Sequence, residues 1–364
     1  MFNIRIWIKF LWLTRRQFIP KNFKSYANRD KYFVLRDLNK HGVLDYFKNP
    51  HSYLELLDDF DLKKDETDTY NKDLFNLLLK HKLLIPAGSI ENKFILNTAG
   101  KDTVLQFLLE NPDAGVGLPP FIIPPRISKD LDETLQEYGS HVFERMKGES
   151  VNFDEGFQLF NWDSALSYKK SMYWIGRECA SSFSGLNNLK DGKLLDVGCG
   201  NGFSTADLWG KILPRNNTVH GIDASEDLIN IAKTEYRKWA AQQDHVIPED
   251  APGIIFKTCR AEEIDYPDDH FDAVHIAYVL HWTEDPLVVV KECARVTKPG
   301  GYVFGLQGAN LAVAEWSNVL IRCVGRSSGL PESYKVIEGF FNMAGLKYRR
   351  ATMAGIFVAR KPVK

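Results

Sequence analysis

The chain has 364 residues, enough for two or three domains of ordinary size. Its 44% hydrophobic and 26% charged residues are typical of globular proteins and exclude a largely disordered chain, a collagen or a coiled coil. The 46 basic and 47 acidic side chains give a net charge of −1. That balance argues against a protein organised around nucleic-acid phosphates, which need a surplus of positive charge.

The five cysteines are dispersed and form no C-x-x-C pair. An odd, scattered set predicts neither a disulfide framework nor a zinc knuckle, and indicates a reducing compartment such as the cytoplasm. No H-E-x-x-H or cysteine–histidine pattern predicts a catalytic metal.

Residues 1–25 form a basic, amphipathic N-terminal arm, whose first 24 positions carry six basic residues and no acidic one. Arg5 and Lys9 interrupt the apolar run, which is unlike a signal peptide. No stretch of the chain reaches the ~18–20 apolar residues of a membrane span. Two alternatives remain open: the arm packs on the protein or on a second subunit, or it lies on a membrane surface.

Residues 26–110 have the pattern of three helices followed by a hairpin, which predicts a winged-helix domain. Gly42 ends the first helix, and Ser52 with Glu55 forms a capping-box pattern at the second. The expected elements are a helix ending at 42, helices over 52–60 and 69–82, and strands at 83–85 and 94–96.

Acidic side chains cancel the basic ones around the third of these helices, so DNA binding is not expected there. A dimerisation or lid role fits better, and the dimerisation role would give a homodimer. Residues 111–187 follow as a proline-rich linker and a helical cap segment, with helices expected over 127–147 and 163–187.

Residues 188–364 alternate short apolar runs with helical patterns, which predicts βαβ units and a doubly wound, Rossmann-like parallel sheet. Ligands bind such sheets at the carboxyl ends of the strands. The expected strands are 194–197, 219–223, 253–256, 271–276 and 302–306, with helices near 204–212, 225–240 and 286–296.

The segment 196–202 (DVGCGNG) lies between a strand and a helix, where glycines let the backbone turn tightly beside a ligand. Asp223 ends the next strand, 21 residues after Gly202, where an acid can bind ribose hydroxyls. NAD, FAD and S-adenosylmethionine all remain candidates on this spacing alone.

Two departures from the dinucleotide fingerprint favour S-adenosylmethionine. Position 203 is phenylalanine instead of the third glycine, and Asp196 would repel a pyrophosphate. A methionyl ammonium, in contrast, can pair with a carboxylate, and a methionyl carboxylate can use the amides of a helix N-terminus.

Four segments resemble, in order, the motifs of class I S-adenosylmethionine-dependent methyltransferases: 194–205 (LLDVGCGNGFST), 221–225 (GIDAS), 259–263 (CRAEE) and 295–301 (RVTKPGG). The resemblance implies a seven-stranded sheet ending in a hairpin, which 346–351 and 356–360 can supply after a helix at 331–344. A winged-helix domain ahead of this fold is similar to small-molecule O-methyltransferases, where 160–162 (FNW) would belong to the segment over the acceptor.

The resemblance also implies roles for individual residues. Asp196 and the glycines would hold the methionyl end, Asp223 the ribose, and the remaining residues the adenine and its surroundings. The cofactor-binding residues on this basis are Asp196, Gly198, Gly200, Gly202, Asp223, Ala224, Ala261, Glu262 and Tyr278.

His281, in the stretch 278–285 (YVLHWTED), is the candidate general base, because an O-methyltransferase must remove a hydroxyl proton. Plant-type O-methyltransferases have their histidine in a similar stretch with one residue more before the tryptophan. Glu284 or Asp285 could orient the imidazole. A structural or substrate-shaping role for His281 is the alternative, whereas His275, in mid-strand, is expected in the core.

The sequence therefore predicts methyl transfer from S-adenosylmethionine to a small, partly apolar molecule, most simply as an O-methyltransferase. One alternative is a lipid- or quinone-directed methyltransferase recruited to a membrane surface by residues 1–24. Another is a winged-helix regulator whose methyltransferase-like domain senses a ligand.

Overall fold

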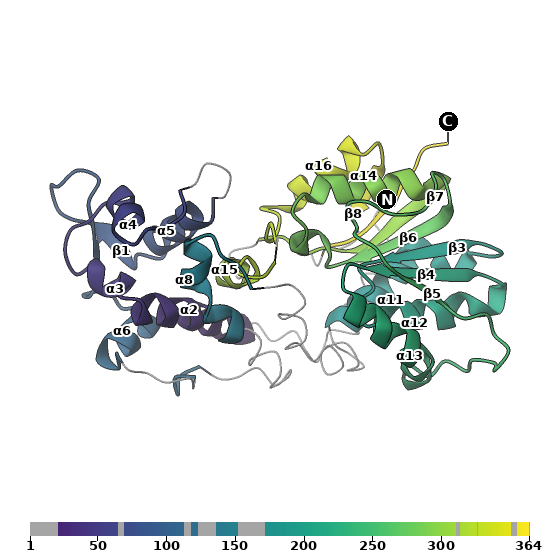
Figure 1. The fold of residues 1–364 in the computed structure, drawn as a ribbon, viewed down its shortest axis with the longest axis horizontal. Helices are drawn as coiled ribbons and strands as arrows, with labels where there is room; N and C mark the ends of the chain where they lie inside the picture. Colours follow the sequence, from purple (N-terminus) through teal and green to yellow (C-terminus); the bar gives the residue numbers. More distant parts are fainter. Residues whose placement is uncertain are drawn as a thin grey trace. The chain divides into compact units, whose positions relative to one another are not determined.

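The structure is a computed structural model that describes residues 21–64, 69–112, 118–122, 136–151, 172–310, 314–325, 327–350 and 355–363. The chain forms two compact units. One contains the described residues of 20–160 together with 310–329, and the other contains those of 161–309 and 330–364 (Figure 1). The first 20 residues of the arm and the 160–162 segment lie outside the described residues.

The N-terminal unit is mainly helical, with one small hairpin. Among the helices that the structure describes, none is long and apolar enough to cross a bilayer. The elements are α2 (Lys21–Lys40), α3 (Val43–Tyr46), α4 (Tyr53–Asp59), α5 (Tyr70–Lys80), β1 (Leu84–Pro86), β2 (Phe94–Leu96), α6 (Thr103–Glu110), α8 (Val142–Met146) and α15 (Glu315–Ile321).

The turn and helix-capping residues predicted for this unit are confirmed. Gly42 has φ +78° just after α2, and Ser52 and Glu55 form the capping box at α4, with Ser52 N donating to Glu55 Oε2 at 2.7 Å. β1 and β2 pair antiparallel, with Ile85 opposite Ile95. The winged-helix interpretation of 26–110 stays a prediction.

α15 comes late in the chain but packs in the N-terminal unit, against α2 and α5. Its Trp316 is buried, Glu315 pairs with Lys80, and Ser317 donates to Asp30. The sequence pattern had assigned 188–364 to one domain. A short amphipathic helix shows which face is apolar but not which core that face joins, so residues 310–329 could not be placed from the sequence.

The C-terminal unit is built on a seven-stranded sheet in the order β5-β4-β3-β6-β7-β9-β8. The first five strands of that order are parallel, and β9 runs antiparallel to both β7 and β8. The strands are β3 (Lys193–Val197), β4 (Thr218–Asp223), β5 (Ile255–Thr258), β6 (Phe271–Ala277), β7 (Thr297–Leu306), β8 (Lys347–Arg350) and β9 (Ile356–Arg360).

This order confirms the doubly wound sheet and its C-terminal hairpin. Successive residues of β3 face opposite ways, so that Leu194 enters one core and Leu195 the other. Two strands start away from their expected places: β7 begins five residues earlier than predicted and β5 two residues later. β5 is an edge strand whose Ile255 is exposed, so its apolar pattern does not mark a core face.

Helices cover both faces of the sheet: α11, α12 and α13 pack on one face, and α14 and α16 on the other (Figure 1). Ser225, Asp285 and Ser333 cap the N-termini of α13, α14 and α16 through backbone amides. The helices are α11 (Met172–Ser184), α12 (Phe203–Ile212), α13 (Glu226–Gln242), α14 (Pro286–Val296) and α16 (Tyr334–Met343), with short turns at Leu186–Asn188, Leu213–Arg215 and Leu280–Trp282.

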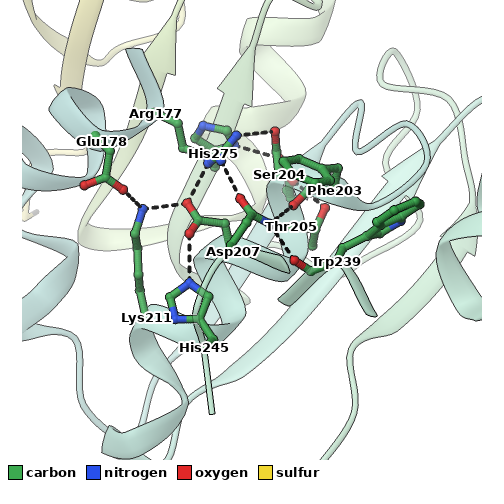
Figure 2. A network of polar contacts seen from close by, with 12 residues as sticks. Arg177, Glu178, Phe203, Ser204, Thr205, Asp207, Lys211, Trp239, His245 and His275 are labelled. Carbon is green, nitrogen blue, oxygen red and sulfur yellow. Dashed lines mark hydrogen bonds and ion pairs between the residues drawn. The ribbon is translucent and has the colours of Figure 1, made fainter. Parts of the chain in front are cut away.

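A buried polar network joins the three helices of the first face (Figure 2). Arg177 of α11 donates to Asp207 Oδ2 of α12 at 2.6 Å and to Gln243 Oε1, just after α13, at 2.7 Å. Asp207 also accepts from Lys211 Nζ at 2.5 Å, and its second oxygen lies 2.8 Å from His245 Nε2. Burial alone would raise the pKa of Asp207, but the charges of Arg177 and Lys211 hold that pKa well below its usual range.

Asp207→Asn tests what this network contributes. The substitution keeps the shape of the side chain but leaves the buried Arg177 guanidinium without its countercharge. Removing one partner of a buried ion pair costs about 3–5 kcal/mol, so we expect a loss of roughly 3 kcal/mol in the free energy of unfolding at pH 7. Urea denaturation measures it.

The same comparison has a predicted pH dependence. A depressed pKa in the folded state gives stability that is complete above the unfolded-state pKa of about 3.9 and is lost as the pH falls below it. The difference in unfolding free energy between wild type and Asp207→Asn should therefore shrink below about pH 4. Asp265→Asn, at an exposed pair with Lys257, is the control and should change stability little. A difference that stays constant down to pH 3 would contradict the account.

Candidate active site

The glycine loop (residues 198–202) turns sharply at the carboxyl end of β3 and leads into α12. Gly198, Gly200 and Gly202 have φ values of +67°, +55° and +82°, in the left-handed region. A Cβ on Gly198 would lie 2.4 Å from Val279 Cγ2. The loop therefore packs directly against the segment that follows β6.

Gly200 is the open position of this loop. A Cβ there would meet no atom within 4 Å, and the residue is partly exposed. The loop thus offers a free backbone surface at the N-terminus of α12, where amides favour a carboxylate. This surface suits an anionic group, and the contact of the three glycines with the methionyl end of S-adenosylmethionine stays a prediction.

Asp223 ends β4 and holds the loop from the side. Its Oδ2 accepts the Gly200 amide proton at 2.9 Å, and its Oδ1 accepts that of Ser225 at 3.0 Å. The structure thus brings the acid next to the glycine loop, at the sheet edge where the spacing predicted it. A carboxylate oxygen can accept more than one hydrogen bond, and the contact of Asp223 with a ribose hydroxyl stays a prediction.

Asp196 lies beneath the loop and is 2% exposed. Thr205 Oγ1 donates to its Oδ2 at 2.6 Å, and His275 Nδ1 lies 2.7 Å from its Oδ1. Both carboxylate oxygens therefore have protein partners. The carboxylate places a buried negative charge beneath the glycine loop, and its two contacts hold the loop in position. His275 is in the core, as expected.

The residues expected around the adenine lie on the loops after β4 and β5. Ala224 is exposed, Ala261 and Glu262 are half-buried, and Arg260 Nη2 lies 3.3 Å from Glu262 Oε1. Their contact with adenine stays a prediction.

Tyr278, directly after β6, has a left-handed backbone with φ +55°. Such a conformation is unfavourable for a bulky side chain and is found most often at functional sites. Its amide donates to the Leu306 carbonyl of β7 at 2.9 Å, which fixes the conformation. The half-buried ring lies at the same end of the sheet as the glycine loop.

His281 is buried in the turn after β6, and Gln307 fixes its orientation. Gln307 Nε2 lies 3.1 Å from His281 Nδ1, while the same amide group accepts from Leu280 N at 3.2 Å and donates to Gly308 O at 3.1 Å. The amide nitrogen therefore faces Nδ1, which accepts, and the proton of the neutral ring is on Nε2. Burial lowers the pKa of His281 to about 4, although the contact with Gln307 opposes part of that shift.

Glu284 is exposed, and the next residue, Asp285, caps α14. The orienting role of Glu284 stays a prediction, and Gln307 is a partner of His281 that the sequence did not reveal. Thr205 was missed as well. A buried glutamine at the end of an apolar strand was the available signal for Gln307, because a buried amide needs hydrogen-bond partners.

The comparisons with known proteins place this site in a family. Residues 195–305 match the methyltransferase domain family. The chain is 31% identical to a demethylmenaquinone methyltransferase of Halalkalibacterium halodurans, over 49% of this chain and 62% of that protein. It is 35% identical to a ubiquinone biosynthesis O-methyltransferase of Thiobacillus denitrificans, over 31% of this chain and 42% of that protein. The chain thus spans about half the length of these relatives.

The fold likeness extends further than the sequence likeness. The crystal structure of the DszA carbon methyltransferase superposes with a TM-score of 0.64 at 15% identity, covering 97% of this chain and 93% of that one. At this identity the comparison shows the fold alone.

The C-terminal unit is therefore a class I methyltransferase domain. S-adenosylmethionine is the cofactor of this domain.

Gly198→Ala tests the glycine loop. The new Cβ would meet Val279 and would occupy an unfavourable φ, so the loop must shift away from its present path. We expect S-adenosylmethionine binding, measured by calorimetry, to weaken at least tenfold.

Gly339→Ala, in α16, is the matched control. A Cβ there would meet no atom within 4 Å, and alanine favours a helix. This variant should bind as wild type does. Equal binding by Gly198→Ala and wild type would show that the loop is not the cofactor site.

Proposed function

We propose that the protein transfers the methyl group of S-adenosylmethionine to a small, partly apolar molecule with a hydroxylated aromatic ring, of the quinol class. The observation that supports the proposal is the position of His281, which is buried in the turn after β6 at the carboxyl end of the sheet, with its Nδ1 3.1 Å from Gln307 Nε2. The names of the two quinone-related relatives support the same acceptor class.

Bound at the glycine loop, S-adenosylmethionine supplies an electrophilic methyl group on a sulfonium. The protein must then align a nucleophile with that methyl group and exclude water from the reacting atoms. The negative charges of Asp196 and Asp223 favour a cationic ligand at the carboxyl ends of β3 and β4. His281, after β6, is the side chain we assign to the acceptor end, and the cofactor contact expected of Tyr278 stays a prediction.

His281 is proposed as a hydrogen-bond donor to the acceptor, in place of the general base expected from the sequence. A base needs a free lone pair and a pKa near the working pH. Here Nδ1 accepts from Gln307, and the pKa of about 4 makes the ring a weak base. An N–H donor instead stabilises negative charge on a phenolic oxygen, so the acceptor would lose its proton to solvent water as it binds, and transfer of the methyl group to the phenolate would then leave S-adenosylhomocysteine.

A phenolate is nucleophilic at oxygen and at its ortho and para ring carbons, so the same site suits two reactions. O-methylation is the simpler expectation for a hydroxylated acceptor, and methylation of a ring carbon is the other outcome. Which atom is placed in line with the methyl group decides between them.

The proposal is tested with the full chain, S-adenosylmethionine and a naphthohydroquinone or catechol kept reduced under anaerobic conditions. We expect S-adenosylhomocysteine to form with the reduced ring and not with the oxidised quinone, because only the reduced ring has a nucleophilic oxygen. Mass spectrometry and NMR of the product distinguish an O-methyl from a C-methyl group. A chain that binds S-adenosylmethionine but methylates no hydroxylated aromatic would refute the proposal.

Variants of His281 separate a donor from a base. His281→Gln keeps an N–H donor that does not titrate, so kcat/KM should stay within about tenfold of wild type, whereas His281→Phe should lose considerably more. A general base contributes typically 10²–10⁴-fold, so a loss of about that size in both variants would establish base catalysis instead. His270→Gln, at the opposite end of β6, is the control and should keep its activity.

A further inference from the structure

Three side chains with metal-binding atoms converge in the N-terminal unit, away from the glycine loop. Asp37 lies near the end of α2, His41 comes one turn after Asp37 and directly follows that helix, and Glu144 lies in α8, beside α2 (Figure 1). One ligand atom from each side chain lies within 4.8 Å of the other two.

Two of these atoms are buried without a hydrogen-bond partner. His41 Nε2 and Glu144 Oε2 are each inaccessible to solvent, and no described residue forms a hydrogen bond with either. A buried polar atom that forms no hydrogen bond is costly, and native proteins contain few of them. Two such atoms facing the same carboxylate indicate a missing ligand.

Packing holds the three side chains in this arrangement. Asp37 Oδ2 accepts the Phe143 amide proton at 2.8 Å, which leaves Oδ1 on the side of His41, 3.6 Å from Nε2. The His41 ring stacks on Phe143, with ring centroids 4.3 Å apart and planes within 10°. Two ligands of a tetrahedral Zn²⁺ lie about 3.4 Å apart, so this separation needs almost no adjustment.

We propose that Asp37 Oδ1, His41 Nε2 and Glu144 Oε2 bind one divalent transition-metal ion that joins α2 to α8. An imidazole with two carboxylates suits Zn²⁺ or a neighbouring first-row metal better than Mg²⁺ or Ca²⁺, which prefer oxygen ligands alone. The ion would also neutralise two carboxylates that otherwise face each other in a buried place. Three protein ligands leave a position for water.

A proton shared between the two carboxylates is the competing explanation. Burial raises the pKa of Asp37, and the nearby Glu144 carboxylate adds to that effect, although the Phe143 amide and His41 oppose it. A shared proton would satisfy Glu144 without any metal. It would leave His41 Nε2 without a hydrogen-bond partner, whereas a metal ion would bind all three ligand atoms.

Sequence patterns could not reveal this site. Asp37 and His41 are four residues apart, which is a metal-binding spacing on a helix but a common one by chance. The third residue comes 103 positions after His41, and only the packing of α8 on α2 brings it near.

The test is calorimetry of the full chain with Zn²⁺ after dialysis against a chelator. We expect one site per chain in wild type that weakens at least tenfold in His41→Ala and in Glu144→Gln. His141→Ala is the matched control, since this partly exposed histidine lies close in sequence to α8 but outside the cluster, and its binding should equal wild type. Asp37 is left intact because it accepts the Phe143 amide proton.

Circular dichroism of each variant without metal shows whether it is folded, and Glu144→Gln preserves shape should His41→Ala fail to fold. Saturating Zn²⁺ should raise the melting temperature of wild type by several degrees and leave that of Glu144→Gln almost unchanged. Equal Zn²⁺ affinity in wild type and both variants would overturn the proposal. So would a wild type that binds no Zn²⁺ but whose melting temperature depends on the protonation of a carboxylate pair.

Discussion

A buried carboxylate at the end of β3 is the constraint on which the active site depends. Asp196 is tied to Thr205 in the first turn of α12 and to His275 in β6. These two contacts fix the start of the helix and the neighbouring strand relative to the loop between them. A buried carboxylate without these partners would be too costly, so the two contacts keep β3, the glycine loop and α12 in a fixed arrangement.

A second carboxylate completes the loop and sets its electrostatic character. Asp223, at the end of β4, accepts the Gly200 amide proton. Gly200 is the glycine of this loop at which an added Cβ would meet no atom within 4 Å. With Asp196 below and Asp223 beside it, the loop favours a ligand that carries positive charge next to its anionic group. A pyrophosphate offers only negative charge, which is the physical reason why we expect this glycine pattern to bind a sulfonium cofactor in place of a dinucleotide.

Short-range features were predictable from the sequence, and contacts between distant residues were not. The strand-loop-helix pattern around Gly198 and the spacing to Asp223 follow from backbone geometry, so both were found. The tautomer of His281 depends on Gln307, 26 residues away, and Arg177 finds Asp207 only once α11 packs on α12. Residues 310–329 could not be placed from the sequence for the same reason, because an apolar helix face does not specify which hydrophobic core it packs against.

The central claim is that the glycine loop, with a carboxylate beneath it and another beside it, is an S-adenosylmethionine site. The most direct measurement is calorimetric titration of the full chain with S-adenosylmethionine, S-adenosylhomocysteine and NAD⁺ in separate experiments. The account predicts that both adenosyl sulfur compounds bind at one site per chain and that NAD⁺ gives no binding heat. Binding of NAD⁺ by a folded chain that ignores S-adenosylmethionine would contradict it.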